Sequence, residues 1–248
     1  MSQKILILFT NIFLFVTAIT AQQYPEIVKV KGGSFKMGDE LGLGQADEQP
    51  VHIETVRKFG IAKTETTVLQ WKTYCKATGK QMPKSQSGEW MDNHPITSVS
   101  WEEAAAYCLW LSQKTGKQYR LPTETEWEFA ARGGNQSKGF TYSGGHSIDS
   151  TSWCIENSNT STHAIAQKKA NELGLYDMSG NVWEWCQDWY LFKASEQNNP
   201  QLANKGTTRV LRGGCVKNPA SSCRVAERGS SLPDYRDPFL GFRVALEL

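Results

Sequence analysis

The chain has 248 residues, of which 39% are hydrophobic and 21% charged, a composition typical of a soluble globular protein with one large domain or two small ones. Its formal net charge of +2 is too small to indicate a nucleic-acid or membrane-surface partner. The counts of nine tryptophans and 21 glycines indicate a loop-rich fold in which aromatic side chains hold irregular backbone together. No repeat, charge block or linker follows Pro25, so we predict one domain over residues 22–248.

Residues 1–21 have the pattern of a secretory signal peptide. Lys4 provides a positive start, residues 5–16 are mostly apolar, and Ala18-Ile-Thr-Ala21 ends the segment in small residues. The apolar run is too short to span a membrane. A buried N-terminal strand or helix is the competing interpretation, and the flanking residues favour the signal peptide. We therefore expect an exported protein, periplasmic or secreted, with no membrane span after signal removal.

Further along, short strands are predicted at 27–30 and 34–37, around Gly32-Gly33, and a strand region at 51–59. Thr66 is expected to cap a helix over 67–78 that ends at Gly79. Two capping boxes, Ser100-Trp-Glu-Glu103 and Thr123-Glu-Thr-Glu126, predict helices that end before Gly116 and at Gly133. The polar stretch 135–173 predicts a long loop, and 209–248 predicts short strands around turns. The whole pattern predicts an α+β domain with little regular structure.

The segment 174–190 is the most informative part of the chain. It places Trp183, Trp185 and Trp189 among the acidic residues Asp177, Glu184 and Asp188. Aromatic side chains at this density supply a large buried area. Carboxylates buried among them must be paired, protonated or bound to a cation. The segment therefore predicts a structural or metal-binding centre.

The chain contains six cysteines, and this even number favours disulfides in an exported protein. Six cysteines allow fifteen connectivities, and their spacing does not choose among them. Cys75 and Cys108 lie on predicted helices and are expected to be core residues. The four histidines have no close ligand spacing, so each is expected to be structural or at the surface.

Six segments in this order resemble the formylglycine-generating enzyme family, also called the sulfatase-modifying-factor family. They begin with Gly32-Gly-Ser-Phe-Lys-Met-Gly38 and His94-Pro-Ile-Thr-Ser-Val-Ser-Trp, and continue with Arg120-Leu-Pro-Thr-Glu-Thr-Glu-Trp, 174–190, Arg209-Val-Leu-Arg-Gly-Gly214 and Gly241-Phe-Arg243. The resemblance covers about residues 25–246. It implies a variant of the C-type-lectin-like fold.

The resemblance also implies an activity, the oxidation of a sulfatase cysteine to formylglycine by oxygen, with copper(I) held between two thiolates of the enzyme. In the enzymes, cysteines follow a Gly-Gly-Ser turn at the third and eighth residues after the serine. Here Cys215 replaces the serine, and only Cys223 matches when residues are counted forward. When they are counted back from Arg228, Cys215 takes the first place and Ala220 the second. Neither register supplies both thiols.

Cys215 and Cys223 remain the candidate catalytic residues, as an altered thiol pair with copper as the cofactor. The competing interpretation is a disulfide, and the resemblance suggests Cys186 as the partner of Cys223. The chain is then an oxidase acting on a sulfatase or another exported protein. The alternative function is a non-catalytic binding or interaction module on the same scaffold.

The resemblance implies calcium in the aromatic segment as well. Carried over by position, its ligands are the side chains of Asp177 and Glu184 and the carbonyl oxygens of Gly180 and Val182. Calcium prefers several oxygen ligands of this kind. The alternative is that the two carboxylates cap turns or pair with arginines such as Arg212 or Arg243.

Overall fold

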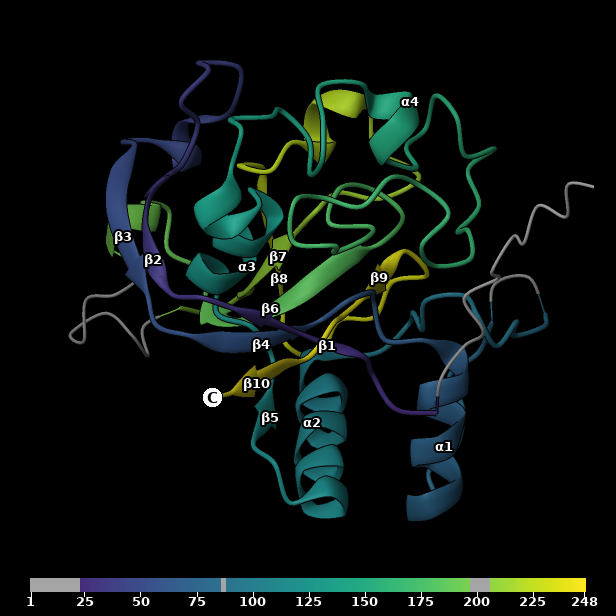
Figure 1. The fold of residues 1–248 in the computed structure, drawn as a ribbon. Coiled ribbons are helices and arrows are strands. Elements are labelled where there is room, and N and C mark those ends of the chain that lie inside the picture. The colour runs from purple at the N-terminus through teal and green to yellow at the C-terminus, as the bar shows by residue number, and fades with distance from the viewer. Residues whose placement is uncertain (1–22, 86–87, 197–205) are drawn as a thin grey trace, which may run out of the picture.

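The computed structural model describes residues 23–85, 88–196 and 206–248, so the predicted signal peptide lies outside the described residues (Figure 1). Its strands form three small sheets. The first has the order β1-β4-β10-β5 and is antiparallel throughout; its strands are Ile27–Val30, Phe59–Ala62, Ala245–Glu247 and Tyr119–Arg120. The second pairs β2, Gly33–Met37, with β3, His52–Val56. The third has the order β8-β7-β6-β9, with strands Arg228–Ser231, Arg209–Arg212, Trp183–Trp189 and Leu240–Gly241.

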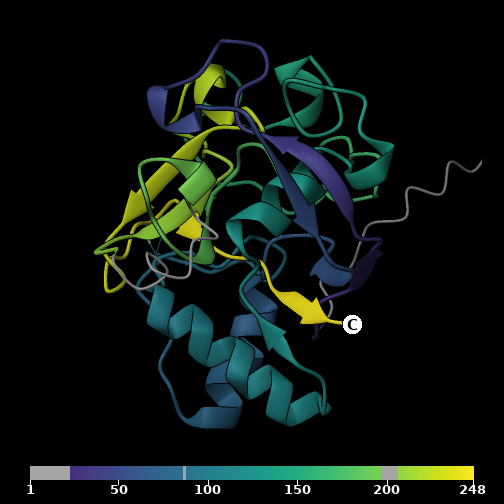
Figure 2. The ribbon, with the colours of Figure 1, turned by 90° about the vertical axis from the view of Figure 1, so that its left-hand side faces the viewer.

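The helices are α1, α2, α3 and the single turn α4, which span Val68–Thr78, Trp101–Thr115, Glu124–Ala131 and Ile148–Thr151. Four short 3₁₀ turns, η1 to η4, span Ala46–Glu48, Gly134–Gln136, Ala194–Glu196 and Ala220–Cys223. The two long helices α1 and α2 lie together at one end of the molecule, and the irregular segments gather at the other (Figures 1 and 2). The predicted α+β class with little regular structure is confirmed.

Both capping boxes predicted from the sequence are present. Ser100 Oγ accepts a hydrogen bond from the Glu103 amide at 3.2 Å, and the Glu103 carboxylate accepts from the Ser100 amide at 2.8 Å. Thr123 and Glu126 exchange the same two bonds. In α1 the cap is Thr67 rather than Thr66, because the Thr66 amide donates to the Phe242 carbonyl instead.

The first two predicted strands exist but do not form a hairpin. β1 pairs with β4, and β2 pairs with β3. Between β1 and β2 the chain crosses from one sheet to another. At this point Gly32 lies so close to β3 that a Cβ on it would be 2.4 Å from the Val56 carbonyl oxygen. The predicted strand region 51–59 is likewise two strands, β3 and β4, that belong to different sheets.

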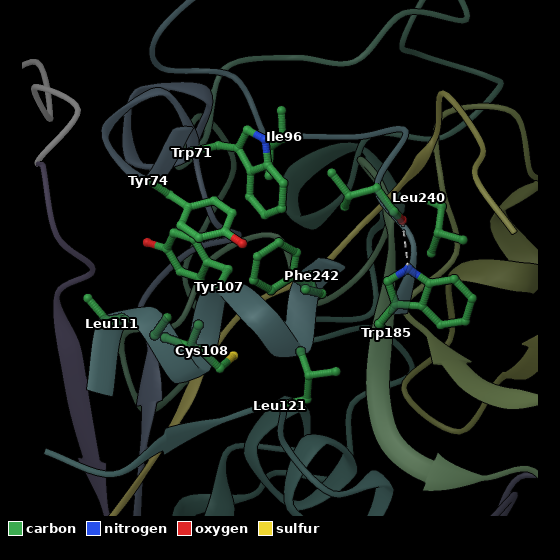
Figure 3. Close-up of a cluster of buried hydrophobic side chains, with 14 of the residues drawn as sticks. Trp71, Tyr74, Ile96, Tyr107, Cys108, Leu111, Leu121, Trp185, Leu240 and Phe242 are labelled. Carbon is green, nitrogen blue, oxygen red and sulfur yellow. Dashed lines mark hydrogen bonds between the residues drawn. The ribbon is translucent and has the colours of Figure 1, made fainter. Parts of the chain in front are cut away.

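A buried aromatic cluster joins α1 and α2 to the C-terminal strands (Figure 3). Trp71 stacks on Tyr107 with ring centroids 5.7 Å apart, and Phe242 contacts both rings edge-on. Trp185 reaches this cluster from β6 and donates its indole N–H to the Val99 carbonyl at 3.0 Å. Cys75 and Cys108 are buried in the same cluster, which confirms their predicted core role.

Glu227 gives the fold a dependence on pH. Burial raises its pKa to about 7; Arg224 lowers the pKa, but Glu48 and Asp47 raise it further. Because the folded pKa lies above the ordinary value of 4.5, this group's contribution to stability is full at low pH and is lost as the pH rises through 7. We expect Glu227→Gln to flatten the fall in stability between about pH 5 and pH 8 by roughly 1–2 kcal/mol. Urea unfolding at both pH values measures this, with the surface variant Glu26→Gln as the control; equal slopes for the two variants contradict it.

Candidate functional site

Before β6, the segment 174–190 contains two non-glycine residues with left-handed backbone, Asp177 at φ 56° and Asn181 at φ 59°. Trp185 is fully buried, and Trp183 packs at the edge of the aromatic cluster. Trp189 lies 3.5 Å from the Arg209 guanidinium, measured from its ring centroid. The tryptophans therefore build core and brace the third sheet.

The buried carboxylate of Glu184 is held by two donor side chains, those of Trp127 and Arg243. Its Oε2 accepts from Trp127 Nε1 and from Arg243 Nε, both at 2.7 Å, and its Oε1 accepts from an Arg243 terminal nitrogen at 2.7 Å. Both side chains of the ion pair are 0% exposed. The sequence left calcium binding and an arginine ion pair open for Glu184, and the structure contains the ion pair, with Arg243.

Asp177 and Glu65 add two more buried carboxyl groups beside this pair. Asp177 accepts from the Ala166 amide at 2.7 Å. Glu65 accepts from the Asn181 side-chain amide at 2.8 Å. Burial raises the pKa of Asp177 to about 6, and burial together with Asp177 and Glu184 raises the pKa of Glu65 well above its usual range.

Three carboxyl groups, those of Glu65, Asp177 and Glu184, therefore interact with one another and with one guanidinium, that of Arg243. Full ionisation would leave excess negative charge in the interior, which must be relieved by protons or by a bound cation. Oxygen donors and excess negative charge suit calcium. Within the described ranges, no three Asp, Glu, His or Cys side chains converge as a metal site, so backbone carbonyls such as those of Gly180 and Val182 would have to complete the ligands.

The second predicted site follows β7 at the turn Gly213-Gly214. Both glycines have positive φ, 100° and 73°. A Cβ on Gly214 would lie 2.2 Å from the Ser222 carbonyl oxygen and 2.9 Å from Cys223 Sγ. Only glycine fits there, and its absent side chain lets η4 pack directly on the turn.

Cys215 and Cys223 come together at this turn as buried thiols, 4% and 0% exposed. Cys215 Sγ donates to Asn218 Oδ1 at 3.1 Å, and Cys223 Sγ donates to the Pro219 carbonyl at 3.8 Å. Burial raises the pKa of Cys215 to about 11 and the pKa of Cys223 further. Both groups are therefore neutral thiols at physiological pH.

The predicted disulfide between Cys186 and Cys223 is not formed, and all six cysteines are free. Cys186 points from β6 into a core cluster with Trp127 and Phe129. Cys223 faces the Gly213-Gly214 turn from η4, where Cys154 and Cys215 are close enough to raise the pKa of its thiol. The side chains of Cys186 and Cys223, which the resemblance pairs, thus point into different surroundings.

A cavity of about 210 Å³ opens between segments that are distant in the sequence; it is lined by Ser85, Glu89, Trp90, Met91, His94, Thr97, Ser161, Thr162, Pro238 and Phe239. Lys217, two residues after Cys215, lies 5.3 Å from the Phe239 ring centroid. Burial lowers the pKa of His94, and His163 lowers it further. His94 and His163 are 69 positions apart in the sequence, so their spacing gives no sign that the fold brings them together.

Within the described residues, no helix has the length and apolar character needed to cross a membrane.

Comparison with known proteins identifies the family. The family model "Sulfatase-modifying factor enzyme 1-like domain" matches residues 15–248. The formylglycine-generating enzyme of Streptomyces coelicolor is 32% identical, over a match that covers 88% of this chain and 88% of that enzyme. The serine/threonine-protein kinase pkn1 of Chlamydia caviae is 33% identical, but the match spans only 38% of that longer protein. PvdO from Pseudomonas aeruginosa superposes with a TM-score of 0.79 at 29% identity, over 92% of this chain and 96% of PvdO. The chain therefore belongs to the sulfatase-modifying factor enzyme 1-like family and has its C-type-lectin-like fold.

Proposed function

We propose that this protein is an exported, non-catalytic binding module on a calcium-stabilised scaffold of the sulfatase-modifying-factor type. The observation that carries the proposal is the state of the two thiols. Cys215 and Cys223 are 4% and 0% exposed, and burial keeps both protonated. Copper(I) binds thiolates, and its ligands must lose their protons first. Buried neutral thiols disfavour that chemistry.

The sequence around the turn supports the same conclusion. Ala220 stands where one register requires the second thiol, and Asn218 stands where the other requires the first. Asn218 instead closes a turn on Cys215 by accepting from its amide at 3.0 Å. The segment therefore lacks the family's thiol pair, and its side chains serve the packing of the turn.

The cavity lined by Trp90 and Phe239 is the candidate binding surface. Its lining combines the aromatic side chains of Trp90 and Phe239 with the hydroxyls of Thr97 and Ser161, a mixture suited to a polypeptide side chain. Met91 at its edge is 54% exposed. The partner we propose is an exported protein such as a sulfatase. Trp90→Ala with Phe239→Ala should weaken binding to that partner at least tenfold in a pull-down titration, whereas unchanged affinity removes the cavity from the proposal.

A turnover assay tests whether the protein oxidises a cysteine to an aldehyde. The reduced protein, loaded with copper(I), is incubated with a sulfatase-type cysteine peptide, with the Streptomyces coelicolor enzyme as the positive control. We expect no aldehyde. Aldehyde formation that disappears in Cys215→Ser and in Cys223→Ser would overturn the proposal.

One observation favours the second candidate function, the oxidation of a protein cysteine. Cys215 and Cys223 are both free, and they are close enough for one to raise the pKa of the other. In that function the two sulfurs would hold copper, which would supply the oxygen chemistry. The side chains would first have to become exposed and lose their protons.

We propose that calcium binds beside the Arg243–Glu184 ion pair and balances the negative charge that Arg243 alone leaves in the buried carboxyl cluster. A cation bound at 100 times its dissociation constant stabilises the fold by about 2.7 kcal/mol, which raises the melting temperature by roughly 5–10 °C. Glu184→Ala is expected to lower the melting temperature and to abolish this calcium response. Glu26→Ala, which removes an exposed ion pair with Lys63, should keep it. A calcium response that survives in Glu184→Ala counts against the site.

Export is supported by the pattern of residues 1–21. N-terminal sequencing of protein recovered outside the cytoplasm should begin at Gln22. A chain that retains Met1 contradicts export.

A further inference from the structure

A second cavity, of about 400 Å³, lies beside the first cavity, the one lined by Trp90 and Phe239. Successive residues of the same segments line the two. Thr97 lines the first cavity, and Ser98 lines the second. The Ser98 amide donates to the Asp237 carbonyl at 3.0 Å, and the residues on either side of Asp237 line one cavity each. A single wall, formed by residues 97–98 and Asp237, therefore separates two adjacent hollows.

Two features of the second cavity indicate that it binds a ligand. Ser98 has a left-handed backbone, with φ 59°, and strained residues of this kind cluster at binding sites. Trp71 lines the cavity and is only 3% exposed, yet its indole N–H has no hydrogen-bond acceptor among the described residues. In Figure 3 the indole nitrogen lies on the edge of the ring next to Ile96, away from Tyr74 and Tyr107. Because a buried donor without an acceptor is costly, the cavity favours a ligand that brings an acceptor.

The charges around the second cavity favour an anionic ligand. Its charged side chains are those of Lys84, Glu103 and Arg236, two cations and one carboxylate, so the lining has a net charge of +1. Glu103 accepts from Arg236 Nε at 3.0 Å. Lys84 is exposed and forms no ion pair with any described residue. Such a lining attracts an anion and repels a cation. Met82 and Pro83 beside Lys84 supply apolar contact for the carbon stem of a side chain.

We propose that the second cavity binds an acidic side chain of the polypeptide whose apolar side chain enters the first cavity. This preference rests on the proposed function, because it concerns the same partner. The Lys84 ammonium donates to the bound carboxylate, and the Ser98 hydroxyl and the Trp71 indole N–H are the further donors that the cavity offers. An extended segment that crosses the wall places side chains of nearby residues in both cavities. The partner segment therefore carries an acidic residue close in sequence to an aromatic or aliphatic one.

The probe for this preference is a library of random dodecapeptides displayed on phage and selected on the folded protein. We expect the selected peptides to combine an aromatic or aliphatic residue with Asp or Glu. Selection on Lys84→Glu should replace the acidic residue by Lys or Arg. The matched control is Lys114→Glu, at an exposed lysine of α2 that lines neither cavity, and it should select the same acidic peptides as the wild type. Both substitutions are at exposed positions, where they leave the fold intact.

A synthetic peptide from the wild-type selection turns the preference into a measured affinity. Replacing its acidic residue by the matching amide should weaken binding about tenfold, the loss expected for one hydrogen bond to a charged group. A peptide with lysine at that position should bind Lys84→Glu more tightly than it binds the wild type. Trp71→Phe, which keeps a ring and removes the N–H, should lose part of the preference for the acid over the amide. Because the cavity is open to solvent, the preference should also weaken as salt is added.

The outcomes distinguish this preference from the proposed function. Peptides whose affinity depends on Trp90 and Phe239 but not on the acidic residue would overturn the second cavity's role and leave the first cavity as the binding surface. An acidic preference that persists in Lys84→Glu would overturn it in the same way. A library from which the folded protein enriches no peptide would overturn both.

Discussion

Arg243→Ala is expected to destabilise the protein by about 3–5 kcal/mol, the cost of leaving a buried charge without its partner. Arg243 is 0% exposed and supplies the cation for Glu184, Asp177 and Glu65. It also donates to the carbonyl oxygens of Ala62 and Tyr176, so its removal leaves several buried acceptors unpaired. A loss of this size is a large part of the stability of an ordinary domain. Urea unfolding measures it as a shift of the midpoint.

Arg236→Ala is the matched control for this measurement. Arg236 pairs with Glu103 at 3.0 Å, but the two side chains are 49% and 34% exposed. Solvent-exposed pairs of this kind contribute about 0–1 kcal/mol. If the two alanine variants lose similar stability, Arg243 is not the cation that holds the carboxyl cluster together.

Gly214→Ala is expected to have the second large effect, a loss of at least about 3 kcal/mol. Part of it arises from the backbone, because φ at this position is 73° and side chains disfavour the left-handed region. The larger part is steric, since the Cβ would meet the Ser222 carbonyl oxygen at 2.2 Å. The turn must open to admit the methyl group, and η4 with Cys223 must move away.

Gly79→Ala isolates the backbone part of this effect. Gly79 ends α1 with φ 72°, and nothing lies within 4 Å of the position that its Cβ would occupy. This variant should lose only about 1 kcal/mol. Thermal unfolding of the two variants then gives the steric cost by difference. Equal losses would show that η4 does not pack tightly on the turn.

Local chemistry made much of the fold predictable from the sequence. The boxes at Ser100 and Thr123 were predicted correctly, because a capping box is decided by two residues only three positions apart. The cap of α1 was assigned one residue early, because Thr66 and Thr67 are both suitable and the choice depends on Phe242, far along the chain. The strand partners of β1 and β2 depend on a similar long-range contact, in which Gly32, between the two strands, packs against Val56 of β3.

The candidate sites were predictable only in part, for the same physical reason. The arginine partner of Glu184 was one of two stated alternatives, while Glu65 lies outside the motif and was missed. The Cys186–Cys223 disulfide was expected from the resemblance, yet the two side chains have different surroundings. Cys154 lies in the irregular stretch 135–173, where no periodicity reports which way a side chain points.

The rate at which Cys215 and Cys223 react with iodoacetamide in the native protein measures whether they are buried, protonated thiols. A pKa of about 11 in place of the ordinary 9.0 lowers the thiolate fraction of Cys215 about 100-fold at neutral pH, and burial slows the reaction further. We predict that both cysteines remain unmodified at neutral pH over a time in which the urea-unfolded chain is fully labelled. Rapid labelling of either cysteine in the folded protein would show that the thiols are accessible and reactive, and would favour the copper-dependent oxidase as the function.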